Sequence, residues 1–181
     1  MLYHVARSYS SLAMAMFVSQ GWNAPPTQGK SGKYPLGTYG NRPLQLPFRE
    51  EYGGRRLYQA LMDGEDVELP PRDISSHLPA EPWVHKADPN QSRIWNQYPH
   101  LAVSVYRNRI DNARSIAEKD ERFNEVQARR LYDMLHGMMP KKCLVLDMDA
   151  VMAGDFEQLA LIVKMAGGEF DEAEAAACIM R

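Results

Sequence analysis

The chain has 181 residues, of which 45% are hydrophobic and 24% charged, and its formal net charge is −2. This length suits one domain with a substantial core, and the composition is that of a globular protein. The small net charge gives no general attraction for nucleic acid. No run approaches the ~18 consecutive apolar residues of a membrane span, and the two cysteines form neither a disulfide framework nor a zinc pattern. We therefore expect one cytoplasmic domain over residues 1–181, with no metal and with neither nucleic acid nor membrane as partner.

Short apolar runs alternate with longer segments of helical periodicity along the chain. Strands are expected at 2–6, 83–85, 101–106 and 143–146, and helices at 12–20, 49–62, 90–97, 109–138 (as one helix or two), 156–166 and 171–179. Prolines and glycines without periodicity indicate an irregular insert at 22–47. Because strands alternate with helices, the sequence predicts an α/β fold of three layers, in which helices flank a mainly parallel sheet.

The turn between the first predicted strand and the first predicted helix reads Arg-Ser-Tyr-Ser-Ser, residues 7–11. Free backbone N–H groups and the positive end of the helix dipole favour an anion such as phosphate at this position. One arginine and the hydroxyl groups of three serines can add further hydrogen bonds, the arginine's being charge-assisted. In the alternative interpretation, Ser10 and Ser11 only cap the helix.

A second basic stretch follows the apolar run 101–106. Arg107 lies at the carboxyl end of this predicted strand, where ligands of open α/β sheets bind. Ser115 lies eight residues later, about two helical turns on, and Asp111 near the helix start suits the helix dipole. In the alternative interpretation, Arg107 pairs with a surface carboxylate and Ser115 is an ordinary helical residue.

Gly29-Lys30-Ser31 is similar to the end of a phosphate-binding Walker A motif, but that motif needs a glycine where Ala24 stands. It also needs a strand directly upstream, and Pro25-Pro26 interrupts the loop instead. We interpret this stretch as a basic loop.

Taken in order, these stretches resemble the motifs of the sulfotransferases, which use 3′-phosphoadenosine 5′-phosphosulfate as sulfuryl donor. Residues 7–11 resemble the family's Lys/Arg-Ser-Gly-Thr-Thr/Ser turn. Residues 107–115, Arg-Asn-Arg-Ile-Asp-Asn-Ala-Arg-Ser, resemble its Arg-Asn-Pro-x-Asp-x-x-x-Ser motif. Residues 83–89 are similar to a lysine- and proline-containing stretch of bacterial members, and residues 144–159 to a late strand and helix of the family. The resemblance covers most of the chain and implies a P-loop NTPase-like topology.

The resemblance also implies roles for individual residues. The 5′-phosphosulfate of the donor would be bound by Arg7, Ser8, Tyr9, Ser10, Ser11 and Leu12, and the 3′-phosphate by Arg107 and Ser115. His85, which lies 22 residues before Arg107, would be the catalytic base. Lys86 would neutralise the departing bridge oxygen, and Arg7 would steady the leaving 5′-phosphate. The acceptor would be a hydroxyl group of a small molecule or glycan, and no metal is required.

Two features depart from the family pattern. Tyr9 replaces a glycine of the first motif, and no stretch matches the Arg-Lys-Gly…Gly-x-x-x-Trp loop that covers the adenine in the family. We therefore expect donor binding that is weaker, differently organised or lost. Three functions stay open: an active sulfotransferase, a degenerate sulfotransferase-fold protein that binds or inhibits a protein partner, and another P-loop-like enzyme such as a small kinase.

Overall fold

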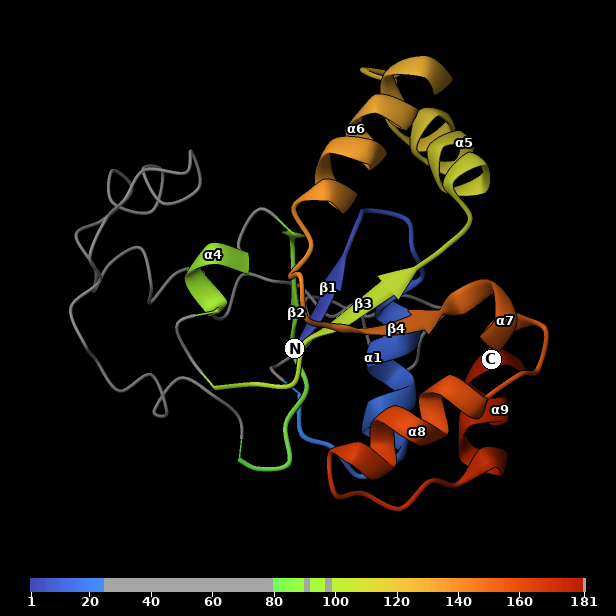
Figure 1. Cartoon of the computed structure of the whole chain (residues 1–181). Coiled ribbons are helices and arrows are strands. Elements are labelled where there is room, and N and C mark those ends of the chain that lie inside the picture. Colours follow the sequence, from blue (N-terminus) through green and yellow to red (C-terminus); the bar gives the residue numbers. More distant parts are fainter. Residues whose placement is uncertain (25–79, 90–91, 97–98, 181) are drawn as a thin grey trace.

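Four parallel strands form the sheet in the described part of the protein. The computed structural model describes residues 1–24, 80–89, 92–96 and 99–180. The strands are β1 (Leu2–His4), β2 (Lys86–Ala87), β3 (Val103–Tyr106) and β4 (Leu144–Asp147). Their order in the sheet is β2-β1-β3-β4 (Figure 1). The predicted α/β class with a parallel sheet is confirmed.

The pairing of the strands aligns their carboxyl ends at one edge of the sheet. Leu2 of β1 pairs with Lys86 on one side and with Val103 on the other. At the end of β3, Tyr106 pairs with Asp147 of β4. Because β1 and β3 are neighbours, the segments that follow them meet at this carboxyl edge.

Seven helices surround the sheet in the described part of the chain. They are α1 (Ser10–Ser19), α4 (Ser92–Trp95), α5 (Arg109–Lys119), α6 (Glu125–Gly137), α7 (Met148–Met152), α8 (Glu157–Met165) and α9 (Glu172–Met180). In Figure 1, the pair α5–α6 lies at the end toward which β1 runs, and α1, α8 and α9 lie together at the lower right. None of the described helices is long and apolar enough to cross a membrane.

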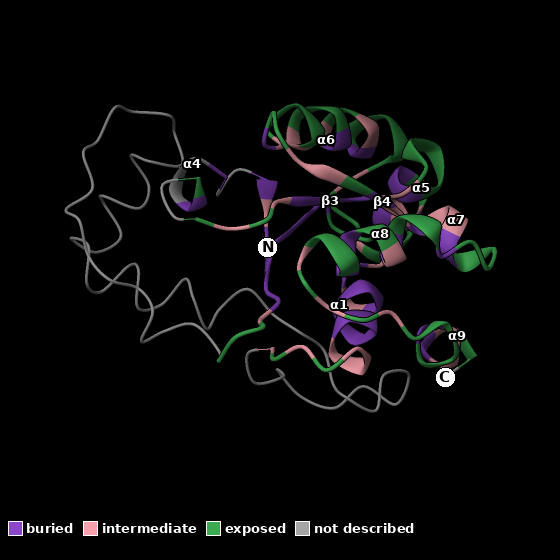
Figure 2. Ribbon diagram, turned by 60° about the horizontal axis from the view of Figure 1, so that its bottom comes forward, coloured by how far each residue is buried: buried purple, intermediate pink, exposed green. Residues whose placement is uncertain are grey.

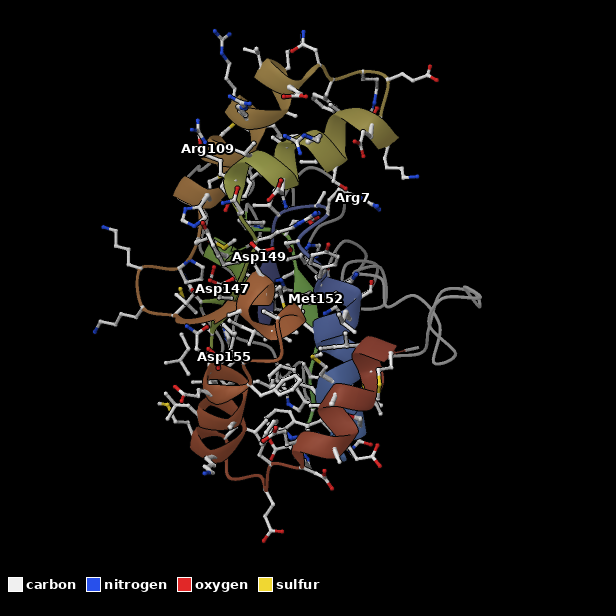
Figure 3. All side chains as sticks on the ribbon, turned by 90° about the vertical axis from the view of Figure 1, so that its right-hand side faces the viewer. Arg7, Arg109, Asp147, Asp149, Met152 and Asp155 are labelled. Atoms are coloured by element: carbon white, nitrogen blue, oxygen red, sulfur yellow. The ribbon has the colours of Figure 1, made fainter. Side chains whose placement is uncertain are left out.

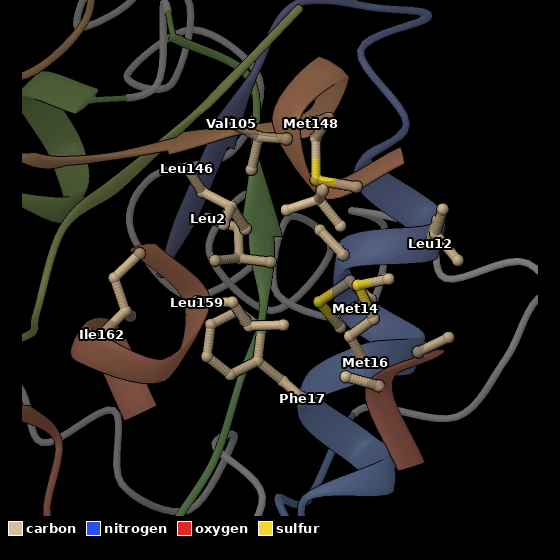
Figure 4. Packing of buried hydrophobic residues seen from close by; sticks show 14 of the residues in the cluster. Leu2, Leu12, Met14, Met16, Phe17, Val105, Leu146, Met148, Leu159 and Ile162 are labelled. Atoms are coloured by element: carbon tan, nitrogen blue, oxygen red, sulfur yellow. The ribbon is translucent and has the colours of Figure 1, made fainter. Parts of the chain in front are cut away.

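The main core lies between the sheet and α1. Residues Leu12–Phe17 of α1 are all buried, as the purple ribbon of Figure 2 shows. They pack against Leu2, Val105 and Leu146 of the strands and against Leu159 of α8 (Figure 4). Full burial of each large apolar side chain contributes about 1.5–3 kcal/mol. This core fixes α1, and with it the loop that leads into α1.

A smaller core joins α5 and α6 to the end of β1. Val5, directly after β1, packs with Ala113 and Ile116 of α5 and with Ala128 and Tyr132 of α6. The α5–α6 pair is therefore held against the loop between β1 and α1.

Several predicted elements differ in the structure. The segment 109–138, expected as one helix or two, forms two helices because the backbone at Asp120 is extended. The short helix α7 was not predicted; the side chain of Asp147 caps its start by accepting from the amide of Asp149 at 2.9 Å. The predicted helix 49–62 and Gly29-Lys30-Ser31 lie outside the described residues, as does nearly all of the predicted insert 22–47.

The predicted strand 83–85 is displaced along the chain. Trp83 forms only an isolated bridge with Asn23, and the strand itself is Lys86–Ala87. The reason is register, because Leu2 donates its amide to His85 O at 2.7 Å and pairs with Lys86. His85 therefore precedes the strand instead of ending it.

Candidate anion-binding site

The loop between β1 and α1 has an unusual backbone. Arg7 has φ 69° and Tyr9 has φ 62°, so two residues other than glycine adopt the left-handed conformation. This conformation costs roughly 1–2 kcal/mol for an L-residue with a side chain. Ser8 lies between them and donates its amide to Val5 O at 3.3 Å. Strain of this kind persists where the surrounding structure enforces it, and it clusters at functional sites.

Two side chains from neighbouring elements hold this loop in place. Asn112 of α5, which is fully buried, donates from Nδ2 to Ala6 O at 3.1 Å. Arg107, directly after β3, donates from a terminal guanidinium nitrogen to Arg7 O at 3.0 Å. Two carbonyl oxygens that would repel an anion are thus occupied by donors.

The N-terminus of α1 has no side-chain cap among the described residues. Its N-cap residue is Tyr9, and its first turn has no acidic residue. The nearby helix α5 differs, because Asn108 Oδ1 accepts from the amides of Ile110 at 2.9 Å and Asp111 at 3.4 Å. The first N–H groups of a helix need partners from outside the helix. At this edge, α1 therefore offers a site for an anion, whereas α5 is already capped.

Polar side chains surround the start of α1. Ser8 is 1% exposed, and its buried Oγ has no partner among the described residues. Lys86 reaches from β2 to α1, where its Nζ donates to Ser11 Oγ at 3.1 Å. Burial lowers the pKa of Lys86 to about 8, and the nearby Asp88 opposes this shift. An anion bound here would give the Ser8 hydroxyl an acceptor and would stabilise the charged form of the lysine.

Two arginines lie beside the loop. Arg7 donates from Nε to Ser115 Oγ at 3.3 Å, and the guanidinium carbon of Arg107 lies 4.4 Å from the centre of the Tyr9 ring. The Nε of Arg107 is buried and has no partner in the described part of the chain. No described carboxylate pairs with either arginine. Two guanidinium groups without a described counter-charge, beside a helix N-terminus without a described side-chain cap, form a site suited to a polyanion.

Figure 3 shows Arg7 between the α5–α6 pair and the upper end of α1. Arg109 lies well apart from Arg7 in this view. Its guanidinium forms an ion pair with Asp133, and both side chains are about half exposed. Arg109 is therefore a surface residue of α5 and a suitable comparison for Arg107.

His85 does not join this cluster. Leu2 pairs with both Lys86 and Val103, so these two residues lie level with each other in the sheet. His85 lies one position before Lys86, and Arg107 lies four positions after Val103. The offset of five positions corresponds to about 16 Å along the strands. His85 is 2% exposed, and its Nδ1 lies 2.6 Å from Lys86 O. Burial lowers its pKa to about 4, so the imidazole is neutral at neutral pH.

Most of the residues implied by the resemblance lie at the carboxyl edge of the sheet. The residues brought together there are Arg7, Ser8, Tyr9, Ser10, Ser11, Leu12, Lys86, Arg107 and Ser115. Sequence reasoning missed Asn112, since an asparagine inside a predicted helix usually faces solvent. The role of Asn112 is apparent only from the burial of its side chain, which depends on the fold.

A separate pocket of about 540 Å³ lies near the amino ends of the strands. Its lining includes Met1, Trp22, Trp83 and His100. Since Met1 precedes β1 and Arg7 follows it, this pocket and the arginine cluster lie toward opposite ends of the sheet.

Comparison of the chain with protein-family models, with curated proteins and with solved structures finds no match.

Proposed function

We propose that the chain is a sulfotransferase that moves a sulfuryl group from 3′-phosphoadenosine 5′-phosphosulfate to a hydroxyl group of a small molecule or glycan. One observation carries the proposal: Arg7 is joined by hydrogen bonds to Arg107 and Ser115, which lie 100 and 108 residues further along the chain, beside the start of α1, which has no described side-chain cap. A donor with phosphate at both ends of its ribose needs two anion sites close together. The start of α1 supports one such site, and the pair Arg7 and Arg107 supports the other.

The start of α1 fits the 5′ end of the donor. The N–H groups of Ser10, Ser11 and Leu12 occupy the first turn, and the buried hydroxyl of Ser8 has no partner among the described residues. The donor supplies an activated sulfuryl group whose sulfur is open to attack by an oxygen. The chain orients that group, and the charges of Lys86 and Arg7 stabilise negative charge that develops on the departing phosphate oxygen.

The arginine pair fits the 3′-phosphate. Arg107 is held by its bond to Arg7 O and by the Tyr9 ring, and its Nε stays available for a ligand. The hydroxyl of Ser115 lies within reach of Arg7. Because these donors are already positioned, little side-chain entropy is lost when the phosphate binds.

Tyr9 favours a second candidate function. Its ring lies beneath Arg107, at a position where the family motif has glycine. If this stacking prevents Arg107 from reaching a phosphate, the fold serves as a binding or inhibitory module for another protein.

Calorimetric titration with adenosine 3′,5′-bisphosphate and with adenosine 5′-monophosphate tests the proposal. A charge-assisted contact contributes about 1.5–3 kcal/mol, so the bisphosphate should bind roughly 10- to 150-fold more tightly. This preference should disappear in Arg107→Ala and persist in the control variant Arg109→Ala, whose arginine pairs with Asp133.

Equal affinity of the wild type for both nucleotides would refute the proposal. Tight binding of the bisphosphate without sulfuryl transfer to any hydroxyl acceptor would favour the degenerate binding module. Metal-dependent hydrolysis of nucleoside triphosphates would instead favour another P-loop-like enzyme.

A further inference from the structure

The pocket near the amino ends of the strands has no part in the proposed transfer. Its volume of about 540 Å³ is ordinary for a small-molecule site. Its lining includes two of the three tryptophans of the chain, Trp22 and Trp83, together with Pro82, Pro99 and one carboxylate, Glu81. Such a lining suits a small ligand with apolar surface and one polar or charged group.

Hydrogen bonds hold the two segments that carry the tryptophans beside each other. Asn23, which directly follows the first of them, donates its amide to Pro82 O at 2.8 Å, and its carbonyl oxygen accepts from the amide of Val84 at 2.8 Å. The side chain of Asn23 also donates from Nδ2 to Ala80 O at 2.8 Å. Segment 80–84, which contributes the second tryptophan and the carboxylate, is therefore fixed in position.

The indole of Trp22 is itself held by its neighbours. Its ring centre lies 5.3 Å from that of Phe17 in an edge-on arrangement. The backbone at Gly168 is so near that a Cβ atom there would lie 3.4 Å from Trp22 Nε1. Because this ring is positioned before a ligand arrives, little side-chain entropy is lost on binding.

The charges around the pocket favour a cation. Glu81 is exposed, and neither lysine nor arginine is among the described residues that line the pocket. The amino group of Met1 donates to Leu101 O at 2.9 Å, and burial lowers its pKa to about 5, so it carries no charge at neutral pH. Lys142, in an adjoining hollow, and Lys164, in the last turn of α8, are exposed and lie outside the lining.

Two helices also end beside the pocket. Ala166 and Gly167, which line it, directly follow α8, and Trp22 lies three residues after the end of α1. The carbonyl end of a helix carries a partial negative charge that stabilises nearby cations. The helix ends and the carboxylate therefore act in the same direction.

We propose that this pocket binds a small organic cation, such as a quaternary ammonium compound, through Trp22, Trp83 and Glu81. The face of an aromatic ring attracts a cation, and tryptophan does so best. The carboxylate balances the charge of the ligand and disfavours phosphate-bearing molecules. This site goes beyond the proposed function and is independent of it, because the pocket and the arginine cluster lie toward opposite ends of the sheet.

The test compares choline with 3,3-dimethylbutan-1-ol, which keeps the shape of choline but has carbon in place of the charged nitrogen. Binding to the whole chain is followed through the indole N–H signals in proton–nitrogen correlation NMR spectra. Choline should shift the signals of Trp22 and Trp83, whereas that of Trp95, which does not line the pocket, should stay in place. Two cation–π contacts at exposed sites predict that choline binds roughly 5- to 30-fold more tightly than the neutral alcohol.

Three variants separate the roles of ring and charge. Trp83→Leu keeps an apolar side chain, so it should weaken binding of choline by about 2- to 5-fold and leave binding of the alcohol nearly unchanged. Glu81→Gln should weaken binding of choline by about 2- to 5-fold as well. The matched control Glu121→Gln removes an exposed carboxylate between α5 and α6 and should bind choline as the wild type does. If Trp83→Leu does not fold, Trp83→Phe replaces it, with a smaller loss expected for choline alone.

Equal affinity of the wild type for choline and for the neutral alcohol would overturn the inference. Absence of shifts at both pocket tryptophans with millimolar choline would overturn it too. Shifts at these signals with a neutral sugar such as glucose, at lower concentration than with choline, would show a carbohydrate site instead. None of these outcomes bears on the binding of adenosine 3′,5′-bisphosphate, which tests the proposed function separately.

Discussion

Replacing Tyr9 by glycine and by alanine separates the backbone strain of the loop from the packing of the Tyr9 side chain. Both variants lose the ring that lies beneath Arg107, where the distance from the guanidinium carbon to the ring centre is 4.4 Å. They also lose the contacts of Tyr9 with the main core. They differ in the backbone, because Tyr9 has φ 62° and ψ 22°, a conformation that glycine adopts without strain.

The magnitude follows from two opposing terms. The left-handed conformation costs alanine roughly 1–2 kcal/mol relative to glycine. Glycine gives the unfolded chain more conformational freedom, which lowers stability by about 0.4–1 kcal/mol relative to alanine. The Tyr9→Gly variant should therefore be more stable than Tyr9→Ala by about 1 kcal/mol.

Gln20, at the other end of α1, provides the matched control. Its φ of −84° is an ordinary conformation for any residue. Both of its variants lose the hydrogen bonds of the Gln20 side chain with the backbone of Asp171. Here the alanine variant should be the more stable one, by about 0.4–1 kcal/mol.

The assay is equilibrium unfolding of the four variants in urea. The difference between glycine and alanine should have opposite signs at the two positions. Equal stability of Tyr9→Gly and Tyr9→Ala, or greater stability of Tyr9→Ala, would show that the loop does not hold Tyr9 in the left-handed conformation.

Three further predictions concern buried polar side chains. Asn112→Ala removes the donor to Ala6 O and should lower the free energy of unfolding by about 1–3 kcal/mol in urea titration. Burial lowers the pKa of Lys86 to about 8 from its usual 10.5, so the unfolded chain holds this proton more tightly. The free energy of unfolding should therefore rise with pH across this interval, and less so in Lys86→Met. Burial also lowers the pKa of His85 to about 4 from its usual 6.5. The contribution of the neutral His85 ring to the free energy of unfolding is therefore present above the usual pKa and is lost as the pH falls toward the lowered pKa. Urea titrations should show that His85→Gln reduces this acid loss, and the carbon chemical shifts of His85 should show a neutral ring at pH 6.

The sequence predicts those parts of the site that depend on one strand and the segment after it. The apolar run 101–106 predicts a strand, which the structure has at Val103–Tyr106, and Ser115 lies in the helix α5, which begins two residues after Arg107. The predicted turn 7–11 likewise leads from β1 into a helix, but α1 already begins at Ser10, two residues before the predicted start.

Features that depend on register or on contacts between distant segments could not be predicted. The displacement of β2 by a few residues moves His85 away from the carboxyl edge, and a strand of two residues has no alternating pattern that would reveal its register. The contact between His4 and Asp88 and the bond from Asn112 to Ala6 join residues far apart in the sequence. Only the folded arrangement brings these groups together.

A crystal structure of the complex with adenosine 3′,5′-bisphosphate tests the central claim most directly. The account predicts the 5′-phosphate at the amides of Ser10–Leu12, with the Ser8 hydroxyl as a donor, and the 3′-phosphate bound by Arg107 and Ser115. A nucleotide bound in the pocket near Trp22 and Trp83, or phosphates that contact neither the start of α1 nor Arg107, would contradict it.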